Sequence, residues 1–156
     1  MTESRSAAEI YQAFLDAVGE TIAQRDFAGY SRYYLFPNRL ITVQKTLLIE
    51  TEADLERLFR SMCHTLELKT VAAPSRACSS AEFAEDGRTI HGAHTTWLVN
   101  ATEEIRQSYK ARSTLRLCDD GAWRLSASQY EDSGGILPNQ VVSMTDDIPG
   151  QKPDDD

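Results

Sequence analysis

The second half of the chain alternates polar and apolar side chains along three consecutive segments, residues 88–100, 104–117 and 122–130. Short polar turns separate them, at residues 100–103 and 119–121. Because successive side chains of a strand point to opposite faces, this pattern predicts three long strands joined by hairpins. One face of such a sheet covers a core, and the other faces water or a partner. The remainder of the chain must therefore supply elements that pack on the inner face.

The first half of the chain supplies two amphipathic helices. Ser6 and Glu9 have the spacing of a capping box, in which each side chain satisfies a free backbone N–H of the other residue. Thr51 and Asp54 repeat this arrangement. After each box, apolar residues recur every three or four positions, which is the period of a helix with one buried face. Both segments are predicted to be helices that cover the sheet.

The segments between and after these helices contain clear breaks. Asp26 is predicted to cap a short helix, Phe27–Tyr34, which Pro37 would end. Residues 39–50 contain two short apolar runs and indicate a strand pair or a bent strand. Residues 68–84 are interpreted as a strand that Pro74 interrupts.

Length and charge limit the class of protein. A chain of 156 residues suits one domain, which we place at residues 1–133, followed by an acidic, mostly flexible tail at residues 134–156. The net charge is −8, and five aspartates lie in the last 23 residues against one lysine. Such a protein would repel phosphate backbones and anionic lipids, so we expect no nucleic-acid partner and no membrane partner.

Cysteine usage and the termini favour a cytoplasmic protein. The three cysteines, Cys63, Cys78 and Cys118, cannot all pair within one chain, and they are interpreted as free thiols. The N-terminus has no apolar segment typical of a signal peptide, and no apolar run has the length of a membrane helix. We find no zinc-type grouping of ligands, no glycine-rich phosphate loop and no nucleophile elbow, so we predict no metal and no cofactor.

The order of elements resembles the nuclear transport factor 2-like superfamily, and within it the SnoaL-like branch. The resemblance covers residues 6–131. It rests on the opening helix into Asp26-Phe27, the Phe36-Pro37 bend, the helix start at Thr51–Leu55 and a closing hairpin around Asp120–Leu125. It implies an α+β fold in which a cone-shaped, curved antiparallel sheet wraps around three N-terminal helices and leaves an apolar pocket at the open end.

The resemblance alone does not determine function, because members include dehydratases, isomerases, cyclases, hydrolases and non-catalytic binders. Members that move protons place an aspartate, or a histidine with an aspartate, on inward strand positions. This chain departs from that pattern. The inward positions inferred for residues 88–100, 105–117 and 123–129 contain neither aspartate nor glutamate.

His94 is the candidate base. We expect the even positions of residues 88–100 to face inward, as the apolar strand face does in similar proteins, which leaves Trp97 on the outer face for a subunit contact. The odd set, with His91 inside, is the alternative, since both faces are half apolar. His94 is then a general base, a hydrogen-bond partner for a ligand or a structural histidine.

Tyr109 on the following strand is the second candidate catalytic residue, since its hydroxyl group is suited to polarising a carbonyl. Alternatively, it is an aromatic residue that fills the cone. Tyr30, Tyr33 and Tyr34 cluster near the predicted mouth. The remaining residues expected to line the pocket are Phe14, Tyr34, Phe59, Met62, Thr96 and Gln129.

Two main hypotheses for function follow. In the first, the chain is a non-catalytic or accessory protein that binds a small apolar molecule and forms a homodimer through the outer sheet face. In the second, it is a cofactor-free isomerase, dehydratase or cyclase that acts on a small apolar carbonyl compound. The missing inward carboxylate favours the first. A third hypothesis is a protein-docking module that uses the Trp97 face or the acidic tail.

Overall fold

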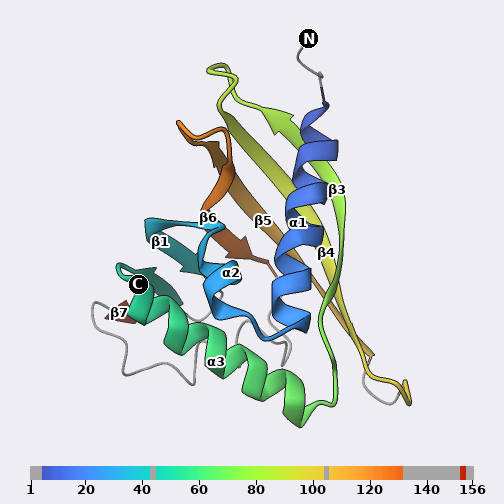
Figure 1. Cartoon of the computed structure of the whole chain (residues 1–156). Coiled ribbons are helices and arrows are strands. Elements are labelled where there is room, and N and C mark those ends of the chain that lie inside the picture. Colours follow the sequence, from blue (N-terminus) through green and yellow to red (C-terminus); the bar gives the residue numbers. More distant parts are fainter. Residues whose placement is uncertain (1–4, 43–44, 104–105, 132–151, 154–156) are drawn as a thin grey trace.

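The computed structural model describes residues 5–42, 45–103, 106–131 and 152–153 (Figure 1). The elements in chain order are α1 (Ala7–Ala23), α2 (Phe27–Ser31), β1 (Tyr34–Ile41), β2 (Lys45–Ile49), α3 (Glu52–Leu68), β3 (Ser75–Phe83), β4 (Thr89–Val99), β5 (Arg106–Leu117), β6 (Trp123–Tyr130) and β7 (Lys152–Pro153). This order confirms the predicted α+β class.

A single curved sheet forms the body of the protein, with strand order β3-β4-β5-β6-β1-β2-β7. The three helices lie on one side of it (Figure 1). Neighbouring strands are antiparallel except for β1 and β6, which run parallel. The expected antiparallel sheet is therefore mixed. A parallel pair needs a long connection, and the chain from β1 to β6 passes through α3 and several other strands.

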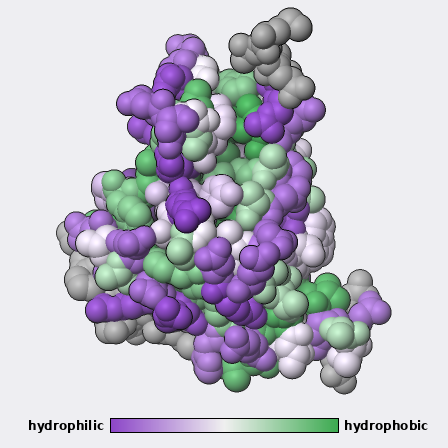
Figure 2. All heavy atoms as spheres, in the orientation of Figure 1, coloured by the Kyte–Doolittle hydropathy of each residue, from purple (hydrophilic) through white to green (hydrophobic). Residues whose placement is uncertain are grey.

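Both long helices begin at the predicted capping boxes. The hydroxyl of Ser6 accepts from the backbone N–H of Glu9 at 3.1 Å, and that of Thr51 accepts from Asp54 at 3.2 Å. Apolar side chains of both helices are buried in the common core. In Figure 2, hydrophilic residues cover the outer sides of α1 and α3, and apolar residues show between them. Each helix therefore directs its apolar stripe toward the sheet.

The segment around Pro37 differs from the sequence-based expectation. The short helix α2 begins after Asp26 as predicted, but it ends at Ser31, and Tyr34 begins strand β1. Pro37 lies inside this strand after a cis peptide bond. Strand β1 pairs with β2 on one side and with β6 on the other. The helical spacing of the nearby tyrosines is a weak local signal. Pairing of β1 with strands on both sides stabilises the extended conformation more than this spacing favours a helix.

The inward face of β4 is the even set, as predicted. Ile90 and Leu98 are fully buried and His94 is 4% exposed, whereas Trp97 is 42% exposed. On β5, Tyr109 and its odd-numbered neighbours through Leu115 face the core. The resemblance therefore selected the correct core face of β4, and alternation identified that of β5.

The domain boundary at residue 133 stays a prediction, since most of the predicted tail lies outside the described residues. The exception is the two-residue strand β7, which pairs with Lys45 and Thr46 of β2. Among the helices of the described part, none combines the length and the apolar character that a membrane crossing requires.

Candidate functional site

A cavity of about 60 Å³ lies between the helices and the inner face of the sheet. Four tyrosines line it, Tyr30, Tyr34, Tyr109 and Tyr130. The other lining residues are Asn38, Leu40, Ile49, Leu58, Met62 and Ser128. Pockets for drug-sized ligands usually measure about 300–1,000 Å³. The cone is therefore mostly filled by its own side chains, and the remaining space suits only a small molecule.

The four tyrosines give the cavity its polar groups. The hydroxyl oxygens of Tyr30 and Tyr34 are 2.5 Å apart, and the rings of Tyr109 and Tyr130 meet edge to face with centroids 5.8 Å apart. Burial raises the pKa of each of these phenols above its ordinary value. All four therefore remain neutral at pH 7, and none is an available base. In the Tyr30–Tyr34 pair one hydroxyl donates to the other, so one of these two protons is already used.

Two other polar side chains of the cavity wall, Asn38 and Ser128, form hydrogen bonds between strands of the sheet. Asn38 is buried, and its amide group donates to the carbonyl oxygen of Leu125 at 2.7 Å and to that of Leu35 at 3.1 Å. The hydroxyl oxygen of Ser128 is 3.3 Å from that of Ser113. These bonds link β1 to β6 and β6 to β5, so the cavity wall is fixed by side-chain contacts as well as by strand pairing.

His94 faces inward as expected but is not among the residues that line the cavity. Its Nδ1 is 2.7 Å from the hydroxyl oxygen of Tyr11, which is itself fully buried. Burial, assisted by the nearby charge of Arg76, lowers the pKa of His94 to about 3. The imidazole is therefore neutral at physiological pH. Its observed contact is with a buried tyrosine of the core.

The predicted pocket residues fall into two groups. Tyr34, Met62 and Tyr109 line the cavity. The other three inward residues are buried around it. Thr96 is paired with Tyr109 across β4 and β5. The ring of Phe59 is tilted against that of Tyr30 with centroids 4.6 Å apart, and Phe14 meets Tyr33 at 5.6 Å.

Gln129 lies on the wrong face for the predicted pocket. It is exposed on the outer side of the sheet, while its neighbours Ser128 and Tyr130 line the cavity. The reason is a bulge in β6. Leu125 pairs with Leu115 and Ala127 with Thr114, so Ser126 is an extra residue. An extra residue reverses the alternation, and every later side chain of the strand changes face.

Sequence reasoning therefore missed Ser128, Tyr130, Asn38 and Tyr11. The bulge in β6 cannot be recognised in the sequence, so Ser128 and Tyr130 were assigned to the outer face. Asn38 was missed because Phe27–Tyr34 was predicted as a helix, so no inward face was assigned to the residues that follow it. Tyr11 belongs to the apolar stripe of α1, but nothing local indicates that it reaches His94, which lies 83 residues away in sequence. A buried asparagine side chain or tyrosine hydroxyl needs a hydrogen-bond partner. This requirement is the one signal by which the sequence could have indicated Asn38 and Tyr11.

The chemistry available at this site is limited. No carboxylate of the described residues lines the cavity. Across the same part of the chain, no group of three or more histidine, cysteine, aspartate or glutamate side chains is placed to hold a metal ion. The arrangement offers apolar contact and neutral phenol, amide and hydroxyl groups. These are groups that bind and orient a small molecule.

Comparison with solved structures identifies the fold. The chain is similar to Rv3472(D26N) from Mycobacterium tuberculosis, a protein of unknown function, with a TM-score of 0.67 and 12% identity over 95% of this chain and 92% of that one. It is also similar to an NTF2-like protein with a cystatin-like fold from Novosphingobium aromaticivorans, with a TM-score of 0.60 and 13% identity over 87% and 88% of the two chains.

A third similar structure is that of Aln2 from a Streptomyces species, with a TM-score of 0.65 and 15% identity over 92% of this chain and 99% of that one. No protein-family model matches the sequence, and no curated protein matches it significantly. The chain therefore has the nuclear transport factor 2-like, cystatin-like α+β fold that its sequence predicts.

Proposed function

We propose that this protein is a non-catalytic, SnoaL-like binding domain that holds a small, largely apolar molecule in the tyrosine-lined cavity and acts as a homodimer. The observation that carries the proposal is the composition of the cavity. Aliphatic side chains of Leu40, Ile49, Leu58 and Met62 surround a few neutral hydrogen-bonding groups. Small-molecule sites in proteins usually combine an apolar lining with a few polar groups that fix orientation.

The size of the cavity restricts the ligand. An engineered cavity of about 150 Å³ admits benzene, whereas this one measures about 60 Å³. A single-ring ligand therefore requires a lining side chain to move. Met62 is only half-buried and is unbranched and flexible, so it is the residue expected to yield. A molecule with one ring and one hydroxyl or carbonyl group would match both the aliphatic wall and the tyrosine hydroxyls.

Catalysis with His94 as the base is the second candidate function. One observation favours it, because hydroxyl groups connect His94 to the cavity. Tyr11 contacts His94, and burial raises the pKa of Tyr11 while the nearby Ser113 hydroxyl lowers it in part. The Ser113 hydroxyl lies beside that of Ser128 in the cavity wall. A base with a pKa near 3 accepts a proton weakly at neutral pH, however. The low pKa of His94 therefore favours a binding function over catalysis.

The homodimer is proposed through the outer face of the sheet. Trp97 and Val99 are both about two-fifths exposed and lie two residues apart on this face of β4. With Gln107 and Ser108 of β5 they surround a shallow hollow of about 220 Å³. Exposed tryptophan beside arginine-bearing strands is typical of protein interfaces, where both residue types are enriched.

Two probes of different size test the binding function. Xenon fits a small apolar cavity without rearrangement, whereas phenol needs the movement of Met62. We expect both to shift the backbone amide signals of residues around Tyr109 in NMR spectra. The Met62→Trp variant fills the cavity and should weaken phenol binding about tenfold or more. His64→Trp is the matched control, since it places the same side chain on an exposed position of α3.

Binding of xenon without phenol would indicate an ordinary packing void and would overturn the proposal. Equal phenol binding by Met62→Trp and the wild type would place the phenol elsewhere and would overturn it as well.

A further inference from the structure

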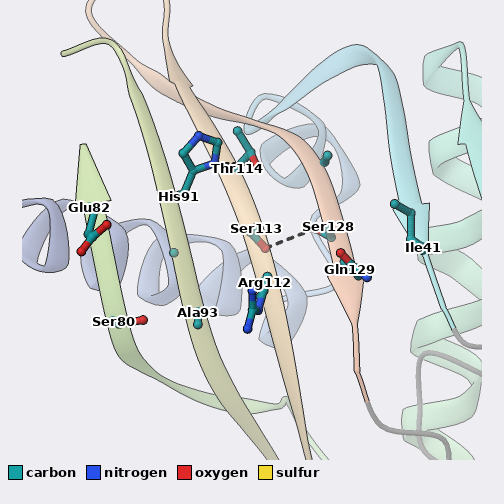
Figure 3. A pocket seen from close by; sticks show the side chains of 12 residues that line it. Ile41, Ser80, Glu82, His91, Ala93, Arg112, Ser113, Thr114, Ser128 and Gln129 are labelled. Atoms are coloured by element: carbon teal, nitrogen blue, oxygen red, sulfur yellow. Dashed lines mark hydrogen bonds between the residues drawn. The ribbon is translucent and has the colours of Figure 1, made fainter. Parts of the chain in front are cut away.

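A large hollow lies on the outer face of the sheet, away from the helices (Figure 3). It measures about 570 Å³, which is within the usual range for small-molecule sites. Its floor contains small side chains at outward positions of three strands, Ser80 of β3, Ala93 of β4 and Ala127 of β6. The hollow therefore exists because the outward residues at its centre are small.

Longer polar side chains stand around this floor. His91 on β4 is paired with Glu82 on β3 and with Thr114 on β5, and Arg112 on β5 is paired with Gln129 on β6. Directly paired residues have Cβ atoms about 5 Å apart, and diagonal neighbours such as His91 and Arg112 are about 7–8 Å apart. Polar side chains from four strands thus border one hollow, together with Ile41 of β1 (Figure 3).

The side chains on this rim can form further hydrogen bonds. The Nε of Arg112 donates to the Glu131 carboxylate at 3.2 Å, but among the described residues its two terminal nitrogens have no hydrogen-bond acceptor. His91 uses Nδ1 in a 3.3 Å contact with the Thr114 hydroxyl, which leaves Nε2 for another partner. Gln129 is exposed beside Arg112. The free part of a guanidinium group is suited to a carboxylate, which it can bind through two parallel hydrogen bonds.

The charge of this face also favours an anionic group. The whole chain has a net charge of −8, yet exposed positions of β1 and β5 on this face are basic, namely Arg39, Lys110, Arg112 and Arg116. Glu82 stands on the opposite rim of the hollow, two strands from Arg112. Of the four basic residues Arg112 lines the hollow, which therefore has a positive group on one side and the Glu82 carboxylate on the other.

We propose that the outer hollow is a second binding site, for a short aliphatic carboxylate with an amino group at its other end. Arg112 and Gln129 bind the carboxylate, and Glu82 binds the ammonium group. Strands β3 and β5 are about 10 Å apart, since neighbouring strands are separated by about 4.8 Å. Side chains of a sheet stand roughly perpendicular to it, so the charged groups of Glu82 and Arg112 keep a separation of this order. An extended chain of about four carbons, with a hydrogen bond of about 2.9 Å at each end, spans it.

This site is independent of the ligand proposed for the inner cavity. It shares the outer face with the proposed dimer contact, but Trp97 lies four residues beyond Ala93 along β4, or about 13 Å away. The Trp97→Glu variant should therefore retain the second ligand even when it no longer dimerises, so that failure of one proposal is distinguishable from failure of the other.

A matched series of probes tests the site in the full-length protein. Butyrate carries only the carboxylate, butylamine only the ammonium group, and 4-aminobutyrate both. We expect 4-aminobutyrate to shift the amide signals of Ala93, Arg112 and Gln129 and to bind about tenfold more tightly than butyrate, because each charged hydrogen bond adds affinity. Butylamine should bind most weakly, because the basic side of the hollow repels it.

Three variants complete the test. Arg112→Gln should weaken binding of both carboxylates about tenfold or more, whereas Arg116→Gln, an exposed arginine on the same strand and face but outside the hollow, should bind as the wild type does. Glu82→Gln should remove the advantage of 4-aminobutyrate over butyrate. Each is a surface change, so the variants should fold normally.

The proposal is overturned if none of the probes shifts these signals, or if Arg112→Gln binds as tightly as the wild type. It is also overturned if Arg112→Gln changes the oligomeric state while no probe binds, since the hollow would then belong to a contact between copies of the chain.

Discussion

The hydroxyl oxygen of Tyr11 on α1 lies 2.7 Å from Nδ1 of His94 on β4, and both side chains are buried. This contact joins the first helix to the centre of the sheet. It depends on Gly92, because a Cβ atom at that position would overlap the Tyr11 ring. Burying two polar groups costs little free energy when they are hydrogen-bonded to each other, but a buried group without a partner is strongly destabilising.

Gly92→Ala is expected to destabilise the protein by about 1–3 kcal/mol, the usual cost of inserting a methyl group into a packed core. The ring of Tyr11 must shift, and its bond to His94 must lengthen. The measurement is the free energy of unfolding in urea. Gly19→Ala is the control, since a Cβ there would have Arg76 Nη2 as its nearest neighbour at 3.8 Å. That helical change should be neutral or stabilising by up to about 1 kcal/mol, and equal losses in the two variants would contradict the prediction.

Stability is expected to fall with acid because of His94. Its pKa is about 3 in the folded protein and about 6.5 in an unfolded chain. Below pH 6.5 the unfolded state binds a proton that the folded state does not, so the free energy of unfolding should decrease by about 1.4 kcal/mol per pH unit. This loss should continue until the pH approaches the folded pKa. The window from about pH 6.5 to about pH 5 lies above the ordinary range of carboxylates and isolates this effect.

The matched control for this pH dependence is His91→Gln, since His91 is exposed and outside the core. That variant should keep the acid slope of the wild type, whereas His94→Gln should reduce it. An NMR titration in which the His94 imidazole protonates near its ordinary pKa of about 6.5 would show the prediction to be wrong.

Trp97→Glu is expected to convert a homodimer into monomers, because it places a charge at the centre of the proposed outer contact. Light scattering measures the mass in solution. Leu68→Glu removes another exposed apolar side chain, 71% exposed at the end of α3, and should leave the dimer intact. A wild-type protein that is already monomeric at micromolar concentration would refute the dimer.

Removal of residues 134–156 is expected to lower the thermal midpoint by only a few degrees, which corresponds to about 1 kcal/mol for a domain of this size. The segment has few apolar residues and many like charges, and its described part, β7, pairs with only two residues of β2. Differential scanning calorimetry of the two forms measures the change. A loss of about ten degrees or more would show that the segment contributes to the core.

The sequence alone determined those features that depend on local spacing. The capping boxes at Ser6 and Thr51 begin α1 and α3 as predicted, because a cap is formed by residues three positions apart. The parity of β4 was predicted from the resemblance instead, because both faces of this strand are half apolar, and the structure places His94 inside and Trp97 outside. The order of these elements was sufficient to predict the fold.

Only the tertiary structure decided the features that depend on contacts between distant segments. The bulge at Ser126 moves Gln129 to the outer face and brings Tyr130 into the cavity, and it exists in the pairing of β6 with β5 rather than in either strand alone. The small cavity and the bond between Tyr11 and His94 likewise result from how the helices pack on the sheet. Local periodicity assigns a face to a side chain, but the partner across the core is set by the three-dimensional packing of the whole chain.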